Sequence, residues 1–312
     1  MEKRRLGSSD QDMTVIGLGT NYVGGHNLYT EVDEAEGIRL VQKALDLGVN
    51  FIDTADVYGL GRSEELVGQA IAGRRDEVLL ATKGGNMFTD GRSGPNNDPD
   101  YLRGALEASL KRLGVDYVDL YYIHRPDGQT PPEDAFGALM QFKEEGLIRA
   151  GGVSNFELPE LKRAASAGPV SALQSRYNLL QREVESEILP YCADNDIAFV
   201  PWGPLAYGLL GGRYGRDFQL AEGDWRHRSG AFDEAVYSRN MDIVDGLKRL
   251  GEAWERSPAH LATQWLLGQP GVGSVISGAK TAVQVEDNVA AGAGALTAAQ
   301  HAEISALATA SG

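Results

Sequence analysis

The sequence has a single cysteine and no apolar run long enough to cross a membrane. With Cys192 alone among 312 residues, an intramolecular disulfide is impossible and a zinc site built on several cysteines is excluded. No apolar segment of the kind a signal peptide needs follows the basic residues 1–13, and no stretch approaches the ~20 apolar residues of a membrane span. We therefore expect a cytoplasmic protein without membrane association.

Positive charge is also scarce. Lys and Arg number 29 against 44 Asp and Glu, which gives a formal net charge of −15. Nucleic-acid binding is not expected, because phosphate contacts need clustered Lys and Arg.

Several catalytic motifs are incomplete. GLGTNY (17–22) and GLGRSE (59–64) lack the third glycine of a dinucleotide-binding fingerprint, and GPLAYGLL (203–210) lacks the Lys-Ser/Thr of a P-loop. GVSNF (152–156) lacks the second glycine of a nucleophile elbow, and the five histidines form no HExxH. Nucleotide hydrolysis, serine hydrolysis and zinc catalysis are therefore disfavoured, and no metal site is expected.

What the sequence does contain is a regular alternation of short apolar runs and amphipathic segments. The apolar runs predict buried parallel strands at 14–19, 50–54, 77–83, 117–124, 150–154, 171–175, 198–202 and 273–277. Helical patterns lie at 34–48, 63–71, 100–114, 132–146, 158–168, 183–195, 241–255, 257–269 and 281–291, with Ser63 as the N-cap of the second.

This alternation predicts an α/β fold with one domain over residues 1–312, a single (β/α)8 TIM barrel. An N-terminal β-hairpin is expected at 3–16, and long loops are expected at the C-terminal face of the strands. A doubly wound open sheet is the alternative, since it gives the same alternation.

Polar side chains close three neighbouring strands of the expected barrel. Asp53 closes the second strand, Lys83 the third and His124 the fourth, and Tyr58 lies in the loop beyond Asp53. Singly, these residues have ordinary structural explanations, such as a capping acid, a packing tyrosine or a core histidine. Together they suit carbonyl reduction, because an ammonium lowers the pKa of a tyrosine, a carboxylate holds that ammonium, and a neutral histidine orients the carbonyl.

The ordered motifs of the chain resemble those of the aldo-keto reductase superfamily. They are FIDTADVYG, LLATKGG, DLYYIHRPD, GGVSNF, QSRYNLLQRE, PWGPLAYGLLGG and ISGAKTAVQVEDN, and they run from about residue 4 to 290. The chain is most similar to the bacterial branch that includes inositol-related and general stress reductases.

The resemblance implies an NADP(H)-dependent oxidoreductase acting on an aldehyde or ketone, or on the corresponding alcohol or sugar, with NAD(H) as the alternative cofactor. It implies the catalytic set Asp53, Tyr58, Lys83 and His124, with Tyr58 as general acid or base. The cofactor contacts it implies are Thr20, Asn21, Asp53, Ser154, Asn155, Gln174, Trp202, Gly203, Pro204, Leu205, Gly208, Gly278, Ala279, Lys280, Gln284, Asp287 and Asn288.

One position departs from the family pattern. Relatives commonly have GAR where this chain has GAK, so Lys280 offers a cation to a 2′-phosphate but not the planar fork of arginine. A solvated surface lysine is the alternative for this position.

Loop position alone gives the substrate-pocket candidates, which are Tyr22, Asn86, Met87, Arg125, Trp225 and Arg226. Arg125 favours an oxygen-rich substrate such as a sugar, polyol or keto acid, unless it forms a loop salt bridge. The segment 205–240 is expected to form part of the pocket lid.

We expect a small-molecule carbonyl or alcohol substrate and a monomer or weak homo-oligomer. The alternative function is a cofactor-binding redox sensor or regulatory subunit with little turnover, as in the potassium-channel β-subunits of the superfamily.

Overall fold

Eight parallel strands form the central sheet of the computed structural model, which describes residues 1–88 and 93–310, apart from the side chains of Trp225, Arg228, Thr309 and Ala310. Their order is β11-β10-β9-β8-β5-β4-β3-β12. The bounds are β3 (Ile16–Gly19), β4 (Phe51–Asp53), β5 (Leu79–Gly84), β8 (Val118–Ile123), β9 (Ile148–Ser154), β10 (Ala172–Arg176), β11 (Ala198–Trp202) and β12 (Val275–Gly278). Each of the eight predicted strands is confirmed.

The sheet closes on itself between β11 and β12. Phe199 and Val272 form a parallel bridge there, and the Phe199 amide donates to the Gly271 carbonyl at 2.9 Å. The Gly273 amide donates back to the Phe199 carbonyl, also at 2.9 Å. The predicted (β/α)8 barrel is therefore confirmed, and the open-sheet alternative is wrong.

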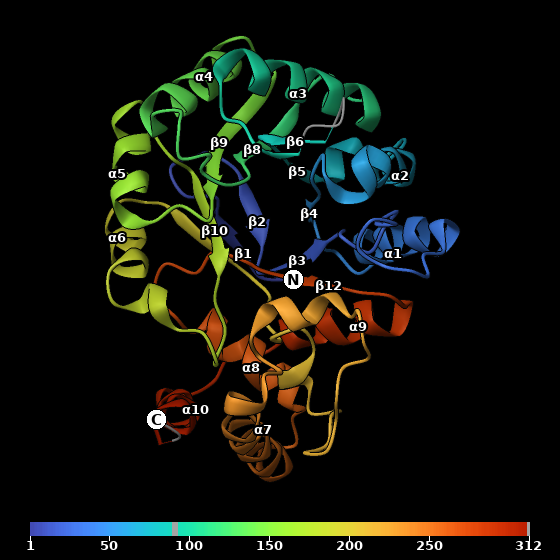
Figure 1. Ribbon diagram of the computed structural model, residues 1–312, viewed down its shortest axis with the longest axis vertical. Helices are drawn as coiled ribbons and strands as arrows, with labels where there is room; N and C mark the ends of the chain where they lie inside the picture. Colours follow the sequence, from blue (N-terminus) through green and yellow to red (C-terminus); the bar gives the residue numbers. More distant parts are fainter. Residues whose placement is uncertain (89–92, 311–312) are drawn as a thin grey trace.

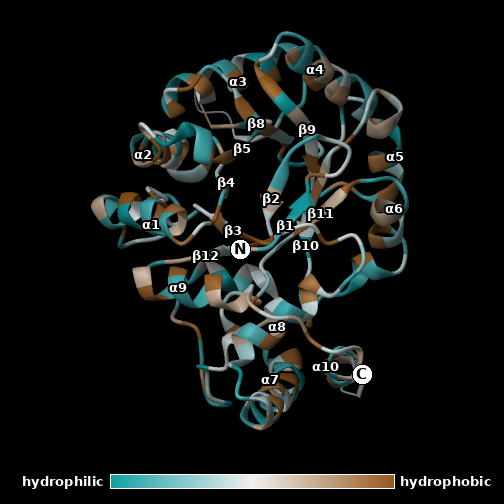
Figure 2. Cartoon of the chain, turned by 180° about the vertical axis from the view of Figure 1, so that it is seen from behind, coloured by the Kyte–Doolittle hydropathy of each residue, from teal (hydrophilic) through white to brown (hydrophobic). Residues whose placement is uncertain are grey.

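Helices surround the barrel and carry both hydrophobic and hydrophilic residues, as amphipathic helices do (Figures 1 and 2). The ring consists of α1 (Glu34–Asp46), α2 (Arg62–Ala70), α3 (Pro99–Leu113), α4 (Pro132–Glu144), α5 (Leu158–Ser166), α6 (Ile188–Asp194), α8 (Pro258–Leu267) and α9 (Ala282–Ala291). None of the helices within residues 1–88 and 93–310 is long and apolar enough to cross a membrane.

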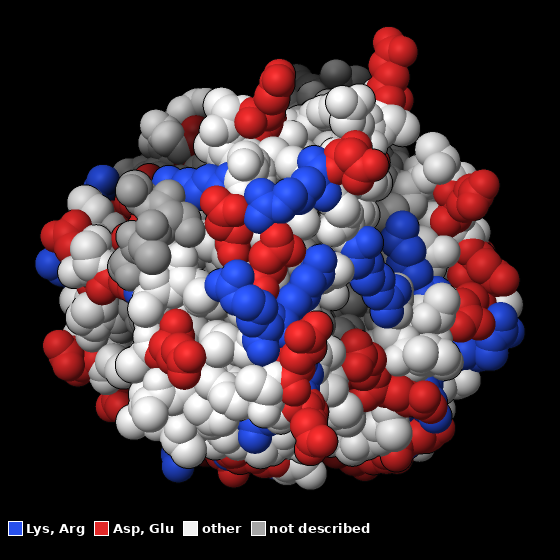
Figure 3. Space-filling view, turned by 90° about the horizontal axis from the view of Figure 1, so that it is seen from below, with Lys and Arg blue, Asp and Glu red and all other residues white. Residues whose placement is uncertain are grey.

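Two further helices, α7 (Glu234–Trp254) and α10 (Ala298–Ala310), pack on each other outside the ring, at the bottom of Figure 1. Seen from below, basic and acidic side chains are interspersed on this face (Figure 3). Arg216, for example, lies 2.7 Å from both Asp242 and Asp245.

Three helix predictions need correction. The helix predicted at 241–255 begins earlier, at Glu234, and shortens the expected loop 205–240. The pattern at 183–195 contains the 3₁₀ turn η3 (Glu183–Glu185) before α6. The Ala-rich tail forms α10, which the sequence pattern did not predict.

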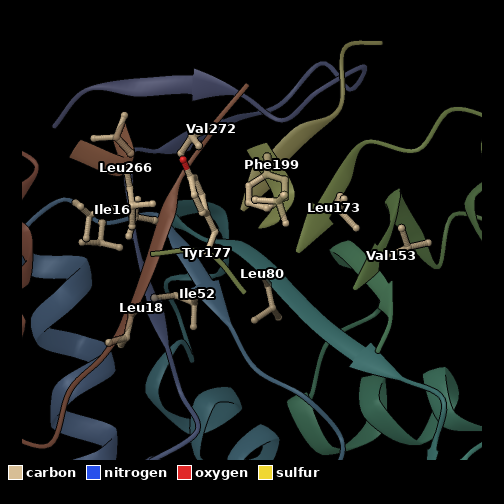
Figure 4. Close-up of a cluster of buried hydrophobic side chains, with 14 of the residues drawn as sticks. Ile16, Leu18, Ile52, Leu80, Val153, Leu173, Tyr177, Phe199, Leu266 and Val272 are labelled. Atoms are coloured by element: carbon tan, nitrogen blue, oxygen red, sulfur yellow. The ribbon is translucent and has the colours of Figure 1, made fainter. Parts of the chain in front are cut away.

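The core has two parts, one between the barrel and the helices and one inside the barrel. The outer part includes Ile16, Ile52, Leu80, Val153 and Leu173, which point from the strands towards the helices (Figure 4). The inner part is filled by alternate residues of the same strands, among them Phe51, Leu79, Leu120, Tyr122 and Val200. Strands buried on both faces explain why the sequence shows continuous apolar runs rather than alternation.

An N-terminal hairpin, β1 (Lys3–Arg5) with β2 (Asp12–Thr14), closes the amino end of the barrel and confirms the prediction for 3–16. Leu6 and Met13 are fully buried in the interior cluster. The hairpin also contacts the starts of the strands: the Thr14 amide donates to Asn50 Oδ1 at 2.7 Å, and Gln11 donates to Asp119 at 2.9 Å. The candidate functional residues lie at the opposite end of the barrel, where the strands end.

Candidate active site

Lys83 lies in β5 as a fully buried cation at the carboxyl end of the barrel. Its Nζ donates to Asp53 Oδ1, at the end of β4, at 2.5 Å and to the Thr54 carbonyl at 2.8 Å. Gln174 Nε2 from β10 donates to the other Asp53 oxygen at 2.8 Å. Burial alone lowers the pKa of Lys83, but Asp53 and Tyr58 outweigh it and the pKa is raised, so the ammonium stays charged.

Tyr58 stands over this ion pair from the short 3₁₀ segment η1 (Tyr58–Gly61) that follows β4. The Lys83 Nζ lies 5.2 Å from the centroid of the Tyr58 ring. Burial raises the pKa of Tyr58, while Lys83 opposes that rise through its charge and a hydrogen bond. The structure therefore brings Tyr58 and Lys83 together.

His124, directly after β8, completes the group. Its ring meets that of Tyr58 edge to face, with centroids 6.1 Å apart. Burial, together with the charges of Lys83 and Arg125, lowers the pKa of His124 well below its ordinary value, so the imidazole is neutral. Its Nδ1 is buried without a hydrogen-bond partner among the described residues. The four predicted catalytic side chains thus converge around one point.

The start of α2 differs from the prediction. Ser63 was expected to be the N-cap, but Gly61, at φ 96°, occupies that position. The left-handed glycine starts the helix earlier and turns Ser63 inward, where its hydroxyl donates to the Thr20 carbonyl at 3.0 Å and lies 3.0 Å from the Thr54 hydroxyl. Ser63 ties the ends of two strands to the helix instead of capping it.

The cofactor candidates on β9, β10 and β11 form a band beside the catalytic group. Asn155, at φ 58°, donates to the His124 carbonyl at 3.1 Å and to the Ser154 hydroxyl at 3.0 Å. Its Oδ1 accepts a hydrogen bond from the Trp202 indole at 3.0 Å. Gln174 reaches the group through its bond to Asp53.

The loop after β11 contains the next cofactor candidates, Gly203, Pro204, Leu205 and Gly208. Gly203 and Gly208 have positive φ, as do Ala206 and Tyr207 between them. The backbone of this loop therefore turns tightly, and the Ala206 amide donates to the Gly203 carbonyl at 3.0 Å and the Gly208 amide to the Leu205 carbonyl at 2.9 Å.

The last cofactor candidates follow β12 and divide into two groups. Asn288 donates to the Gly278 carbonyl at 3.2 Å, and Gln284 accepts from the Lys280 amide at 2.7 Å, so both contact the 278–280 loop that also contains Ala279. Asp287 instead lies 2.8 Å from His260 of α8.

Lys280 itself is engaged with aromatic rings. Its Nζ lies 5.4 Å from the centroid of Tyr22 and 4.8 Å from that of Tyr29, at the distance of cation–π contacts.

The substrate-pocket candidates have varied surroundings. Arg226 is held by Asp224 at 2.7 Å and by the Tyr214 hydroxyl at 2.8 Å. Asn86, in β6 (Asn86–Met87), is buried and its amide nitrogen has no partner among the described residues, while the Met87 sulfur accepts a hydrogen bond from Asn96. Arg125 is exposed and in ion-pair contact with no described acidic residue, and the side chain of Trp225 lies outside the described part.

Sequence reasoning missed two residues of the loop between β3 and α1. Tyr29 accepts a hydrogen bond from Asn21 at 3.1 Å, and burial together with the neighbouring Tyr58 raises the pKa of Tyr29 to about 12. Asn27 hydrogen-bonds to the backbone on both sides of Tyr58. The position of Tyr29 and Asn27 in the chain could have indicated them, because a loop that follows a barrel strand lies at the carboxyl end of the barrel.

A closed barrel with a buried lysine–aspartate pair, a tyrosine and a neutral histidine at its carboxyl end defines a class of oxidoreductases. The model of the Aldo/keto reductase family matches residues 15–309. This chain belongs to that family, whose members are oxidoreductases that act on carbonyl compounds.

Individual relatives support the assignment. The chain is 36% identical over 296 residues to "Aldo-keto reductase yakc [NADP(+)]" of Schizosaccharomyces pombe, covering 92% of this chain and 86% of that protein. It is 33% identical to the "NADH-specific methylglyoxal reductase" of Escherichia coli, covering 93% of each chain. Among solved structures, the glycerol dehydrogenase AKR11B4 from Gluconobacter oxydans superposes with a TM-score of 0.90 at 31% identity, over 98% of this chain and 94% of that one.

Proposed function

We propose that this protein transfers hydride between NADP(H) and an aldehyde or ketone, or the corresponding alcohol, with Tyr58 as the general acid or base. The observation that carries the proposal is the placement of Lys83, which lies between the Asp53 carboxylate and the Tyr58 ring in a fully buried position.

The side chains have complementary tasks in this proposal. Lys83 favours the phenolate of Tyr58 and opposes the rise in pKa that burial causes, which makes proton release to a developing alkoxide easier than from a tyrosine buried without that cation. Asp53 keeps Lys83 charged and fixed. Neutral His124 presents an imidazole that orients the carbonyl oxygen without carrying a charge of its own.

The cofactor contacts suit a dinucleotide that is bound without a Rossmann fingerprint. When bound, the nicotinamide supplies hydride for reduction or accepts it in oxidation. Ser154, Asn155 and Gln174 offer polar groups beside the catalytic set, the 203–208 loop offers left-handed backbone turns, and Lys280 offers a cation. Because one relative is named for NADP(+) and another as NADH-specific, we propose NADP(H) as the main cofactor and NAD(H) as the alternative.

We further propose a small, oxygen-rich substrate. Arg125 is exposed next to His124, and the buried amide nitrogen of Asn86 has no partner among the described residues, so the candidate pocket offers donors to hydroxyl or carbonyl oxygens. Relatives named for methylglyoxal and glycerol fit this substrate class.

Tyr58→Phe is the direct test. We expect turnover of the best substrate in a panel of aldehydes, ketones and polyols to fall by at least about 100-fold, with the dissociation constant of NADPH unchanged. The variant keeps the ring that contacts His124 and removes only the hydroxyl. Unchanged turnover would exclude Tyr58 as the acid, and an inert wild type that still binds NADPH would favour the sensor function.

A further inference from the structure

Residues 21–33 connect β3 to α1 and form a strap across the turn that carries Tyr58. The side chain of Asn27, at the middle of this strap, reaches the backbone on both sides of Tyr58. Its Nδ2 donates to the Val57 carbonyl at 3.0 Å, and its Oδ1 accepts from the Gly59 amide at 2.7 Å. One amide side chain thus holds the two peptide groups that flank the candidate acid.

The turn has an unusual backbone, although it makes 3₁₀-type hydrogen bonds such as that from the Leu60 amide to the Val57 carbonyl at 3.2 Å. Gly59, Leu60 and Gly61 have successive φ values of 59°, 55° and 96°. Leu60 carries a Cβ in the left-handed region, which is unfavourable for a branched apolar residue, and its side chain is exposed. The Gly59 amide donates to an acceptor outside the turn, the Oδ1 of Asn27.

The backbone of the strap also packs directly on the turn. A Cβ added to Gly59 would lie 1.9 Å from the Gly24 carbonyl oxygen, so only glycine fits at this contact. The position of Tyr58 above Lys83 therefore depends on the strap as well as on β4.

The geometry points to Asn27 as a positioning residue for Tyr58, an inference that rests on the proposed role of Tyr58 as acid or base. An amide side chain presents one donor and one acceptor side by side, which matches the Val57 carbonyl and the Gly59 amide. Asn27 holds the turn so that the Tyr58 hydroxyl stays within reach of Lys83, and the lysine charge then favours the phenolate.

The strap offers a matched control, because a second attachment beside it is formed by side chains alone and not by hydrogen bonds to the Tyr58 backbone. Glu34, at the start of α1, lies 2.7 Å from Arg62 and 3.0 Å from His26. Glu34→Gln weakens this attachment while leaving both Asn27 hydrogen bonds in place.

The test compares Asn27→Ala with Glu34→Gln and Tyr58→Phe in the full chain. For Asn27→Ala we expect kcat to fall by about tenfold, because small displacements of a reacting group cost that much or more. We expect the NADPH dissociation constant to stay within about twofold of wild type, since the Asn27 side chain hydrogen-bonds to Val57 and Gly59 and not to a cofactor candidate. The apparent pKa that governs alcohol oxidation should rise, so raising the pH should restore part of the lost rate.

The outcomes separate the alternatives. If Asn27→Ala and Glu34→Gln lower kcat equally, or if Asn27→Ala leaves kcat and its pH profile unchanged while Tyr58→Phe is inactive, the positioning role is wrong and the proposed function stands. If Tyr58→Phe retains full turnover, the proposed function fails first. A loss in Asn27→Ala with a shifted pH profile and wild-type behaviour of Glu34→Gln supports the role.

Discussion

At the scale of single residues, charge placement in the interior decides what the site can do. A buried lysine is tolerated only when a partner compensates the loss of water, and Asp53 with the Thr54 carbonyl provides that compensation. The same ammonium helps to keep His124 neutral a short distance away. The positive charge of Lys83 thus acts to lower the pKa of two neighbouring side chains, against the effect of burial at Tyr58 and together with it at His124.

A second buried carboxyl, that of Asp56, lacks such compensation. Asp56 is 1% exposed and its Oδ1 has no hydrogen-bond partner among the described residues. Burial and the nearby Glu64 raise its pKa well above the ordinary value, although Arg112 and Lys83 act in the opposite direction. A carboxyl whose pKa is higher in the folded than in the unfolded state binds its proton more tightly when folded. Its stabilising contribution is therefore full below the unfolded pKa of about 4 and is lost as the pH rises through the folded pKa.

Asp56→Asn removes this titration and should stabilise the protein at pH 8. We expect the free energy of unfolding to exceed that of wild type there, because the raised pKa of the folded-state Asp56 carboxyl makes its ionisation at pH 8 cost stability. Near pH ~2.5, well below the unfolded pKa of about 4, the advantage should disappear, because Asp56 is then protonated in both states. Urea denaturation at the two pH values measures the difference, and an equal gain at both would contradict this account.

At the scale of elements, features that leave a local sequence pattern could be predicted, whereas features that depend on long-range contacts could not. The eight strands were predictable because each is a short apolar run, such as Val118–Ile123, whose burial on both faces leaves a strong local signal. The polar residues that end them, including Asp53 and His124, were predictable for the same reason.

Other features depend on contacts between distant parts of the chain and were missed. Helix α10 lies in a sequence rich in alanine and glycine with little apolar periodicity, and it is fixed by partners such as Trp265, whose indole donates to Ser305 at 2.8 Å. The Asn27 contacts span about thirty residues and depend on left-handed backbone angles that sequence patterns do not reveal. The N-cap assigned to Ser63 failed because Gly61 offered an earlier start.

The docking of α10 can be tested at Ile304, which is fully buried. Ile304→Ala should lower the free energy of unfolding by about 2–5 kcal/mol, since it removes buried methyl groups and leaves a cavity. Glu303→Ala, on the exposed side of the same helix, should change it by less than about 0.5 kcal/mol. Thermal or urea unfolding measures both, and equal effects would show that α10 does not pack as described.

At the scale of the whole molecule, a protein of net charge −15 has to bind a polyanionic dinucleotide if the proposal holds. The local cation Lys280 has to offset the overall repulsion, and it stands over the rings of Tyr22 and Tyr29. The affinity of Lys280 for a phosphate therefore depends on whether its ammonium can leave the two rings or contact the rings and the phosphate together.

NADPH at 100 times its dissociation constant should stabilise the folded protein by about 2.7 kcal/mol, visible as a rise in Tm.

Lys280→Ala should weaken the binding of NADPH by about tenfold and leave the binding of NADH nearly unchanged, because only NADPH carries the 2′-phosphate. Lys248→Ala, which removes a lysine of α7 near Asp245, serves as the control. Equal losses for both cofactors in Lys280→Ala would remove the assigned role of Lys280.

The N-terminal hairpin covers the amino end of the barrel and limits the directions from which molecules can reach the candidate active site. Since Leu6 and Met13 join the strand side chains that fill the barrel interior, the proposed cofactor and substrate can reach the catalytic group only from the carboxyl end. A barrel filled at one end thereby leaves a single side from which both molecules can approach the catalytic group.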